Sequence, residues 1–167
     1  MRSVCWAPEG TGGAAVHALK YHGWTLAGAD MAREMAALAW PDDVLLERAA
    51  LVPVPLGTTR LRERGYNQSA VLARGVATRW GVPTWDDVLR RTRATRSQTR
   101  LTPGERLVNV AGAFGAVPGA EARLRGAHVV LVDDVVTTAA TLNACAAALV
   151  SGGARLVSYL TFGRARS

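Results

Sequence analysis

The chain has 167 residues, enough for one domain with a hydrophobic core, and 49% of them are apolar. It contains no stretch of about 18 apolar residues and opens without the apolar run of a signal peptide, so we expect a cytoplasmic protein that does not span a membrane. The net charge is +7, and residues 60–106 carry all of it, with eleven arginines against four acidic residues. Such a localised arginine excess favours an anionic ligand, either a di- or triphosphate or a nucleic acid.

The cysteines and histidines follow no metal-binding pattern. Cys5 and Cys145 lie far apart in the chain, and the three histidines form no HxxxH or HExxH pair. A structural zinc site needs about four such ligands, so the sequence predicts no zinc site. A disulfide between the two cysteines is not expected in a reducing cytoplasm.

The first half of the chain predicts helices around one buried strand. Apolar spacing predicts a short helix over 14–21 and a second helix over 25–39. The run LVPVP at 51–55 predicts a buried strand whose two prolines limit its pairing. Helical spacing then predicts a helix over 67–80, and the apolar residues at 82–85 predict a short strand.

The second half predicts a long loop followed by a strand, a helix and a strand. Residues 90–112 are charged and show little apolar periodicity, which is typical of a functional or disordered loop. The run HVVLV at 128–132 predicts a strand covered on both faces, followed by a helix over 141–151 and a last strand over 154–162. This order predicts a parallel sheet and therefore an α/β fold, which we assign to a single domain over 1–167.

The strongest chemical pattern lies between residues 129 and 141, where a buried strand leads into Asp133 and Asp134. Carboxylates at this end of a parallel strand lie where ligands bind, and they can hold two vicinal sugar hydroxyls or coordinate Mg²⁺. A hydroxyl-rich turn and a helix N-terminus follow, and a helix N-terminus attracts phosphate. Together these groups predict a ribose 5-phosphate site whose turn consists of Thr137, Thr138, Ala139, Ala140 and Thr141.

A second pattern follows the predicted strand at 51–55. Arg60, Arg62 and Arg64 stand at alternate positions before Gly65. Their forked donors can converge on a diphosphate, although the same charges also suit an ordinary basic surface loop.

The segment from Asp133 to Thr141 resembles the phosphoribosyl pyrophosphate (PRPP) signature of type I phosphoribosyltransferases. In that family an acidic pair holds the ribose hydroxyls and the following loop surrounds the 5′-phosphate. Two positions depart from the family pattern. Ala139 stands where glycine is usual, and Thr137 stands where relatives acting on purines often carry an aspartate, so a purine salvage role is not expected.

The sequence VPVP, a spaced arginine and then RGYNQ are similar to the signature of the competence protein F (ComF) family within that superfamily. The resemblance implies that Pro55, Leu56 and Gly57 belong to the pyrophosphate-binding loop. It also implies three candidate side chains for the pyrophosphate, namely Arg60, Arg64 and Asn67.

The resemblance extends over about residues 14–163. Leu19, Lys20 and Tyr21 followed by Gly23 match an N-terminal element of the family, and Arg96 and Gln98 match its mobile loop. The implied fold is a type I phosphoribosyltransferase-like parallel sheet flanked by helices, with a small N-terminal helical hood. The cysteine-rich zinc element that many ComF proteins carry is not expected, because this chain starts where that element would end.

Three functions follow as alternatives. As an enzyme, the protein would bind PRPP with Mg²⁺ and transfer its phosphoribosyl group to an acceptor that the sequence does not identify, with no side chain acting as nucleophile. As a competence protein, it would bind single-stranded DNA through the arginine-rich segment, with Tyr66, Trp80 and Trp85 as stacking surfaces. As a sensor, favoured by Ala139, it would bind PRPP without catalysis. The sequence predicts no oligomeric state.

Overall fold

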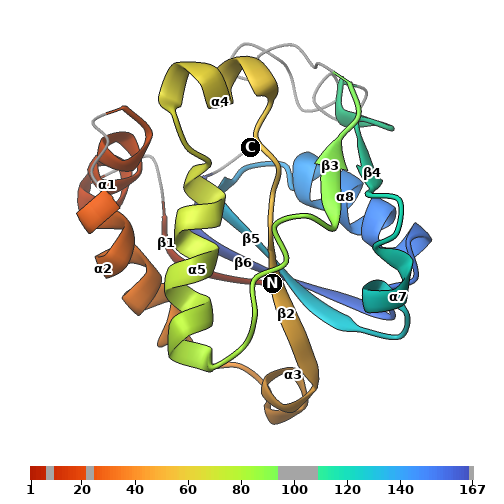
Figure 1. Ribbon diagram of the computed structural model, residues 1–167. Coiled ribbons are helices and arrows are strands. Elements are labelled where there is room, and N and C mark those ends of the chain that lie inside the picture. Colours follow the sequence, from red (N-terminus) through yellow and green to blue (C-terminus); the bar gives the residue numbers. More distant parts are fainter. Residues whose placement is uncertain (7–9, 22–24, 94–108, 166–167) are drawn as a thin grey trace.

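The computed structural model describes residues 1–6, 10–21, 25–93 and 109–165. Its centre is a parallel sheet of four strands in the order β1-β6-β5-β2 (Figure 1). These strands are β1 (Arg2–Trp6), β2 (Arg48–Pro53), β5 (His128–Val136) and β6 (Leu156–Arg164). The predicted α/β fold with a parallel sheet is therefore confirmed.

Three helices cover one face of this sheet, namely α1 (Gly10–Tyr21), α2 (Thr25–Ala36) and α5 (Gln68–Trp80) (Figure 1). Their apolar side chains form one core cluster with those of β5 and β6, including Leu19, Met35, Leu72, Val130 and Leu160. The N-terminal helices expected as a hood thus lie in the same layer as α5. The Tyr66 hydroxyl, which donates to the Leu19 carbonyl, ties α1 to the start of α5.

The other face is covered by α8 (Ala140–Ser151) and by a small antiparallel hairpin of β3 (Leu89–Arg91) and β4 (Phe114–Ala116). Leu142 and Leu149 of α8 pack with Leu131 of β5 and Phe114 of β4 in a second core cluster. Burial of large apolar side chains contributes about 1.5–3 kcal/mol each, so both layers hold the sheet in place.

The structure corrects several sequence predictions. The charged segment predicted as a loop from residue 90 begins instead within β3, whose register pairs Arg91 with Phe114. Residues 82–85 form no strand, and only an isolated bridge joins Thr84 to Leu51. The arginines of residues 60–64 lie in a helix, α4 (Thr58–Arg64). Four further elements were not predicted, namely β1, α3 (Asp42–Glu47), β4 and α7 (Glu121–Leu124).

Within the described residues, no helix combines the length and the apolar character needed to cross a membrane.

Candidate functional site

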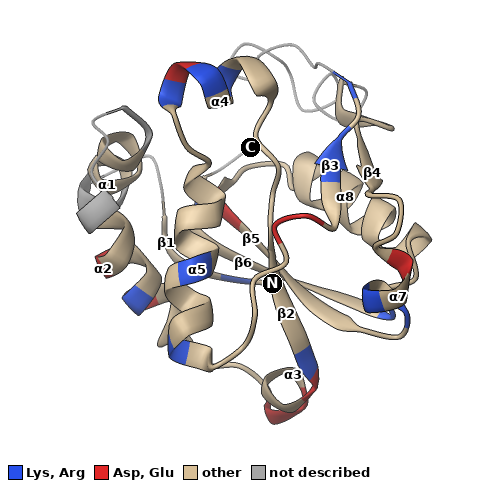
Figure 2. Cartoon of the chain, viewed as in Figure 1, with Lys and Arg blue, Asp and Glu red and all other residues tan. Residues whose placement is uncertain are grey.

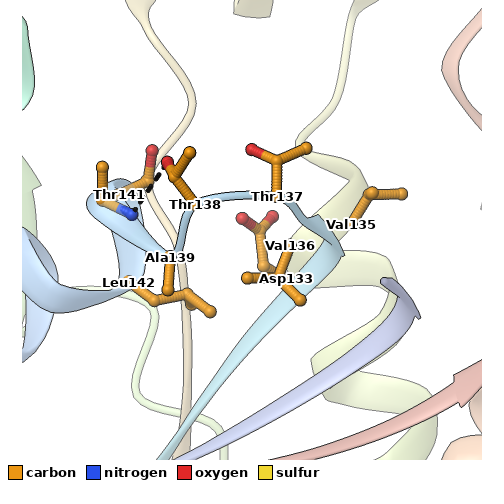
Figure 3. A pocket seen from close by; sticks show the side chains of 9 residues that line it. Asp133, Val135, Val136, Thr137, Thr138, Ala139, Thr141 and Leu142 are labelled. Carbon is orange, nitrogen blue, oxygen red and sulfur yellow. Dashed lines mark hydrogen bonds between the residues drawn. The ribbon is translucent and has the colours of Figure 1, made fainter. Parts of the chain in front are cut away.

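The turn between β5 and α8 forms a hollow at the carboxyl end of the sheet. It opens to solvent. Figure 3 shows the Asp133 carboxylate and the hydroxyls of Thr137, Thr138 and Thr141 directed to the same side of this turn. The lining residues are Asp133, Val135, Val136, Thr137, Thr138, Ala139, Ala140, Thr141 and Leu142.

Asp133 is half-buried and held by two hydrogen bonds. Its Oδ1 accepts from the Ser69 hydroxyl at 2.8 Å and from the Asp134 backbone N–H at 2.9 Å. Ser69 lies in the first turn of α5 and is only 1% exposed, so a buried group on a different element orients the carboxylate. Sequence reasoning missed Ser69, because nothing local shows that it meets a residue 64 positions away.

Asp134 is 4% exposed and does not line the hollow. Its Oδ1 accepts from the Val135 backbone N–H at 2.8 Å. The two carboxylates that the sequence treats as a pair are therefore not equivalent, because Asp133 faces the hollow and Asp134 lies buried behind it.

The first turn of α8 starts at Ala140, so its backbone N–H groups lie beside the hollow. The first N–H groups of any helix have no acceptor within the helix, and the helix dipole adds positive potential there. The residue before α8, Ala139, offers no side-chain cap, and the bond from the Ala140 N–H to the Thr138 hydroxyl is long, at 3.5 Å. This arrangement suits a phosphate group.

Ala139 adopts a left-handed conformation with φ +57° and ψ +7°. Within the described residues it is the one non-glycine residue with positive φ. An L-residue in this region costs about 1–2 kcal/mol because its Cβ approaches the backbone, whereas glycine adopts it freely. The backbone therefore takes the shape that suits the glycine usual in the family at this position.

The predicted pyrophosphate loop follows β2 and leads into α4. Pro55, Leu56 and Gly57 form the connection, with Gly57 as the residue before the helix. Because α4 is helical, Arg60 and Arg64 share one face, while Arg62 points about 200° away. The prediction that all three alternate arginines converge on one ligand is therefore wrong for Arg62, whereas Arg60 and Arg64 keep a common side.

Arg64 and Asn67 join α4 to α5. The Arg64 guanidinium donates to the Gln68 amide oxygen. Asn67 caps α5 by accepting from the Ser69 N–H at 3.1 Å, and its amide donates to the Val54 carbonyl at 3.0 Å. Asn67 thus fixes the end of β2 against α5, and a direct contact between Asn67 and a ligand stays a prediction.

Arg91 of β3 is a residue that sequence reasoning did not assign to the site. Its guanidinium lies over the Phe114 ring, 5.2 Å from the ring centroid. Burial lowers the pKa of Arg91, and the nearby cation Arg60 lowers it further. The hairpin therefore brings an additional arginine beside Gly57 in the loop after β2. Figure 2 shows basic residues of α4 and β3 at the same end of the molecule.

Cys145 of α8 is fully buried beneath the site. Burial, and then the charge of Asp133, raise the pKa of its thiol well above the ordinary value. A thiol held in this neutral form is a poor nucleophile.

The oxygen donors at the turn suit Mg²⁺ better than a softer metal. Asp133 supplies a carboxylate to the hollow, and Mg²⁺ is commonly held by one or two carboxylates together with substrate phosphates. Among the described residues no cluster of three or more histidine, cysteine, aspartate or glutamate side chains forms a metal cage. The donor set therefore fits an ion that arrives with a phosphorylated ligand. The predicted loop residues Arg96 and Gln98 lie outside the described residues.

The family model for the phosphoribosyl transferase domain matches residues 66–166, a range that contains the β5–α8 turn. The chain belongs to this family. The names of the related proteins place the chain in the ComF group of the type I phosphoribosyltransferase superfamily. The predicted resemblance is therefore confirmed.

Three of these relatives are named for DNA use or competence. DNA utilization protein YhgH of Salmonella typhi is 38% identical over 128 residues, which cover 76% of this chain and 51% of that protein. Competence protein F of Haemophilus influenzae is 38% identical over 95 residues, 56% of this chain and 41% of that protein. Competence protein ComFC of Bacillus subtilis is 34% identical over 103 residues, 62% of this chain and 39% of that protein.

The chain thus spans about half the length of the curated relatives it matches. Among solved structures, TT1426 from Thermus thermophilus aligns with a TM-score of 0.40 and 19% identity over 83% of this chain and 82% of that chain. The phosphoribosyltransferase domain therefore occurs here in a protein related to competence and DNA utilization proteins.

Proposed function

We propose that the protein binds PRPP as its Mg²⁺ complex and transfers the phosphoribosyl group to an acceptor. The observation that carries this proposal is the β5–α8 turn. There an oriented carboxylate, three threonine hydroxyls and a helix N-terminus line one hollow, and the arginine-bearing helix α4 follows the neighbouring strand β2. The same proposal places the protein in the cytoplasm, where free thiols such as Cys5 and Cys145 are the rule.

Each part of PRPP has a set of groups suited to it. Asp133, with Asp134 behind it, would hold the ribose hydroxyls, and the turn Thr137–Thr141 would surround the 5′-phosphate. Arg60 and Arg64 would meet the pyrophosphate with Mg²⁺, which neutralises the charge that develops as this group leaves. The acceptor would bond to the anomeric carbon as the bond to pyrophosphate breaks, and the acceptor's proton would pass to solvent.

Calorimetric titration with PRPP and Mg²⁺ tests this proposal. Asp133→Asn keeps the shape of the side chain and removes its charge. Hydrogen bonds to charged groups contribute about 1.5–3 kcal/mol, so PRPP affinity should fall about tenfold or more. Asp42→Asn, an exposed carboxylate at the start of α3, serves as the control and should bind like wild type. Equal affinities for wild type and Asp133→Asn would remove the central claim.

The names of the relatives favour a second candidate, namely binding of single-stranded DNA. The arginines support it, but the aromatic residues do not. The Trp80 indole N–H donates to the Ala36 carbonyl at 3.1 Å, and its ring packs edge-on against Trp40. Trp85 is partly buried in the core beneath Arg123. DNA binding would therefore rest on charge, without the stacking platform expected from Tyr66, Trp80 and Trp85.

A further inference from the structure

Arg91 lies where the β3–β4 hairpin meets the loop after β2. One side of its guanidinium faces the ring of Phe114. Phe114 is also the residue opposite Arg91 in the register of the hairpin. On the loop side it approaches Gly57 so closely that a methyl group there would lie only 3.3 Å from the Arg91 Nη1 atom. The group is therefore held between an aromatic ring and the backbone of the predicted pyrophosphate loop.

Positive charge is concentrated around this position. Arg60 of α4 and Arg93 just beyond β3 both lie near enough to lower the pKa of Arg91, after burial as the main cause. Like charges gathered in a partly buried place are unfavourable for the ligand-free protein, and an anion of high charge relieves the repulsion.

We propose that Arg91 binds the diphosphate group of the ligand and makes the site prefer a diphosphate over a monophosphate. This inference rests on the proposed function for its location but concerns a residue from a different element. An arginine presents forked donors that fit two phosphate oxygens, and its planar group stacks well on an aromatic ring. Phe114 thus restrains the fork from one side, and Gly57 lets the fork reach the loop because it has no side chain.

The test compares three ligands, each measured by calorimetry with Mg²⁺, namely PRPP, inorganic pyrophosphate and ribose 5-phosphate. Arg91→Gln should weaken PRPP and pyrophosphate about tenfold or more and ribose 5-phosphate less than about twofold. Arg91→Lys keeps the charge but loses the forked donors. Its losses of affinity should therefore be smaller, and again larger for PRPP and pyrophosphate than for ribose 5-phosphate. Arg90→Gln, an exposed neighbour on the same strand, is the matched control and should bind all three ligands like wild type.

Gly57→Ala gives a second route if the Arg91 variants are too unstable to assay. The added methyl group must displace the guanidinium by a few tenths of an ångström, so it should weaken pyrophosphate binding while Arg91 stays in the chain. Unchanged pyrophosphate affinity in Arg91→Gln, or in Gly57→Ala where Arg91→Gln does not fold, would overturn the inference. Equal losses for all three ligands would do so as well.

The same data separate this inference from the proposed function. If wild type binds pyrophosphate through Arg91 but does not bind PRPP, the proposed function fails and the diphosphate site stands. If PRPP binds with full dependence on Asp133 and no dependence on Arg91, the inference fails and the proposed function stands. If neither ligand binds wild type, both fail.

Discussion

At the scale of single residues, Ala139 shows how strongly the turn demands a particular backbone. Its neighbours on both sides belong to the hollow, and its positive φ lets the chain turn from β5 into α8 within three residues. The family resemblance indicates that glycine is usual here, but the sequence alone does not show whether alanine changes the turn or is strained by it. The structure shows that the left-handed turn is kept with alanine in it.

Replacing Ala139 by glycine should therefore relieve strain. The relief is worth about 1–2 kcal/mol, against about 0.5–1 kcal/mol for the greater freedom of glycine in the unfolded chain. We expect Ala139→Gly to melt at the same temperature as wild type or slightly above it, and to bind PRPP more tightly. Ala144→Gly, within the regular part of α8, should lose about 1 kcal/mol and serves as the control. A similar loss in both variants would show that position 139 is not strained.

At the scale of elements, substitutions in α4 can distinguish PRPP binding from DNA binding. Arg60 and Arg64 lie on one face of the helix and the exposed Arg62 on another, so one substitution on each face distinguishes the two functions. The helix ends at Gly65, which has a left-handed conformation, and this turn sets how the two faces of α4 are oriented relative to α5.

Arg64→Ala should weaken PRPP binding several-fold more than ribose 5-phosphate binding, whereas Arg62→Ala should leave both unchanged. For single-stranded DNA, Arg62→Ala should reduce the slope of log affinity against log salt by about 0.7, the value of one lost phosphate contact. Titrations at several salt concentrations measure both effects. DNA binding that Arg62→Ala leaves unaltered, with the same slope, would count against a role of this helix in DNA binding.

The elements that the sequence predicted well are those with strong periodicity and clear ends. Strand β5 is a continuous apolar run, and α5 lies between an asparagine cap and Gly81 in the left-handed region. Helix α4 was not recognised because alternate arginines imitate the two-residue period of an extended chain. The strands β3 and β4 have three residues each, too few to show any period.

The residues of the site also fall into those that the sequence could predict and those that it could not. The carboxylates and hydroxyls of the β5–α8 turn are neighbours in the sequence, so the sequence placed them together. Ser69 and Arg91 reach the site from α5 and β3, and only tertiary packing brings them there. Residues of this second kind follow no local pattern, because their positions depend on how whole elements dock.

At the scale of the whole molecule, stability should depend on pH through His128 at the opposite end of the sheet. Its Nε2 lies 2.9 Å from the Ser158 hydroxyl, and the residue is 1% exposed. Burial lowers the pKa of His128, opposed by the charge of Glu47 and assisted by that of Arg155. Between the lowered pKa of the folded state and the unfolded value near 6.5, the unfolded chain binds the extra proton.

The free energy of unfolding should therefore decrease as pH falls below about 6.5, by at most about 1.4 kcal/mol per pH unit from this group. His128→Gln removes the titrating ring, so urea denaturation between pH 7.5 and 5 should give a flatter dependence. His17→Gln, at an exposed position on α1, should keep the wild-type dependence. Parallel curves for wild type and His128→Gln would show that this histidine titrates alike in both states.

The order of the strands also bears on how the chain folds as it is synthesised. Strand β6, near the end of this sequence, lies between β1 and β5, so the first strand pairs only with the last. Until residue 164 has left the ribosome, β1 has no partner, and one edge of the β2–β5 pair stays exposed. The four-stranded sheet is thus completed only once β6 has been synthesised. A nascent chain stalled before β6 should be a target for chaperones and proteases.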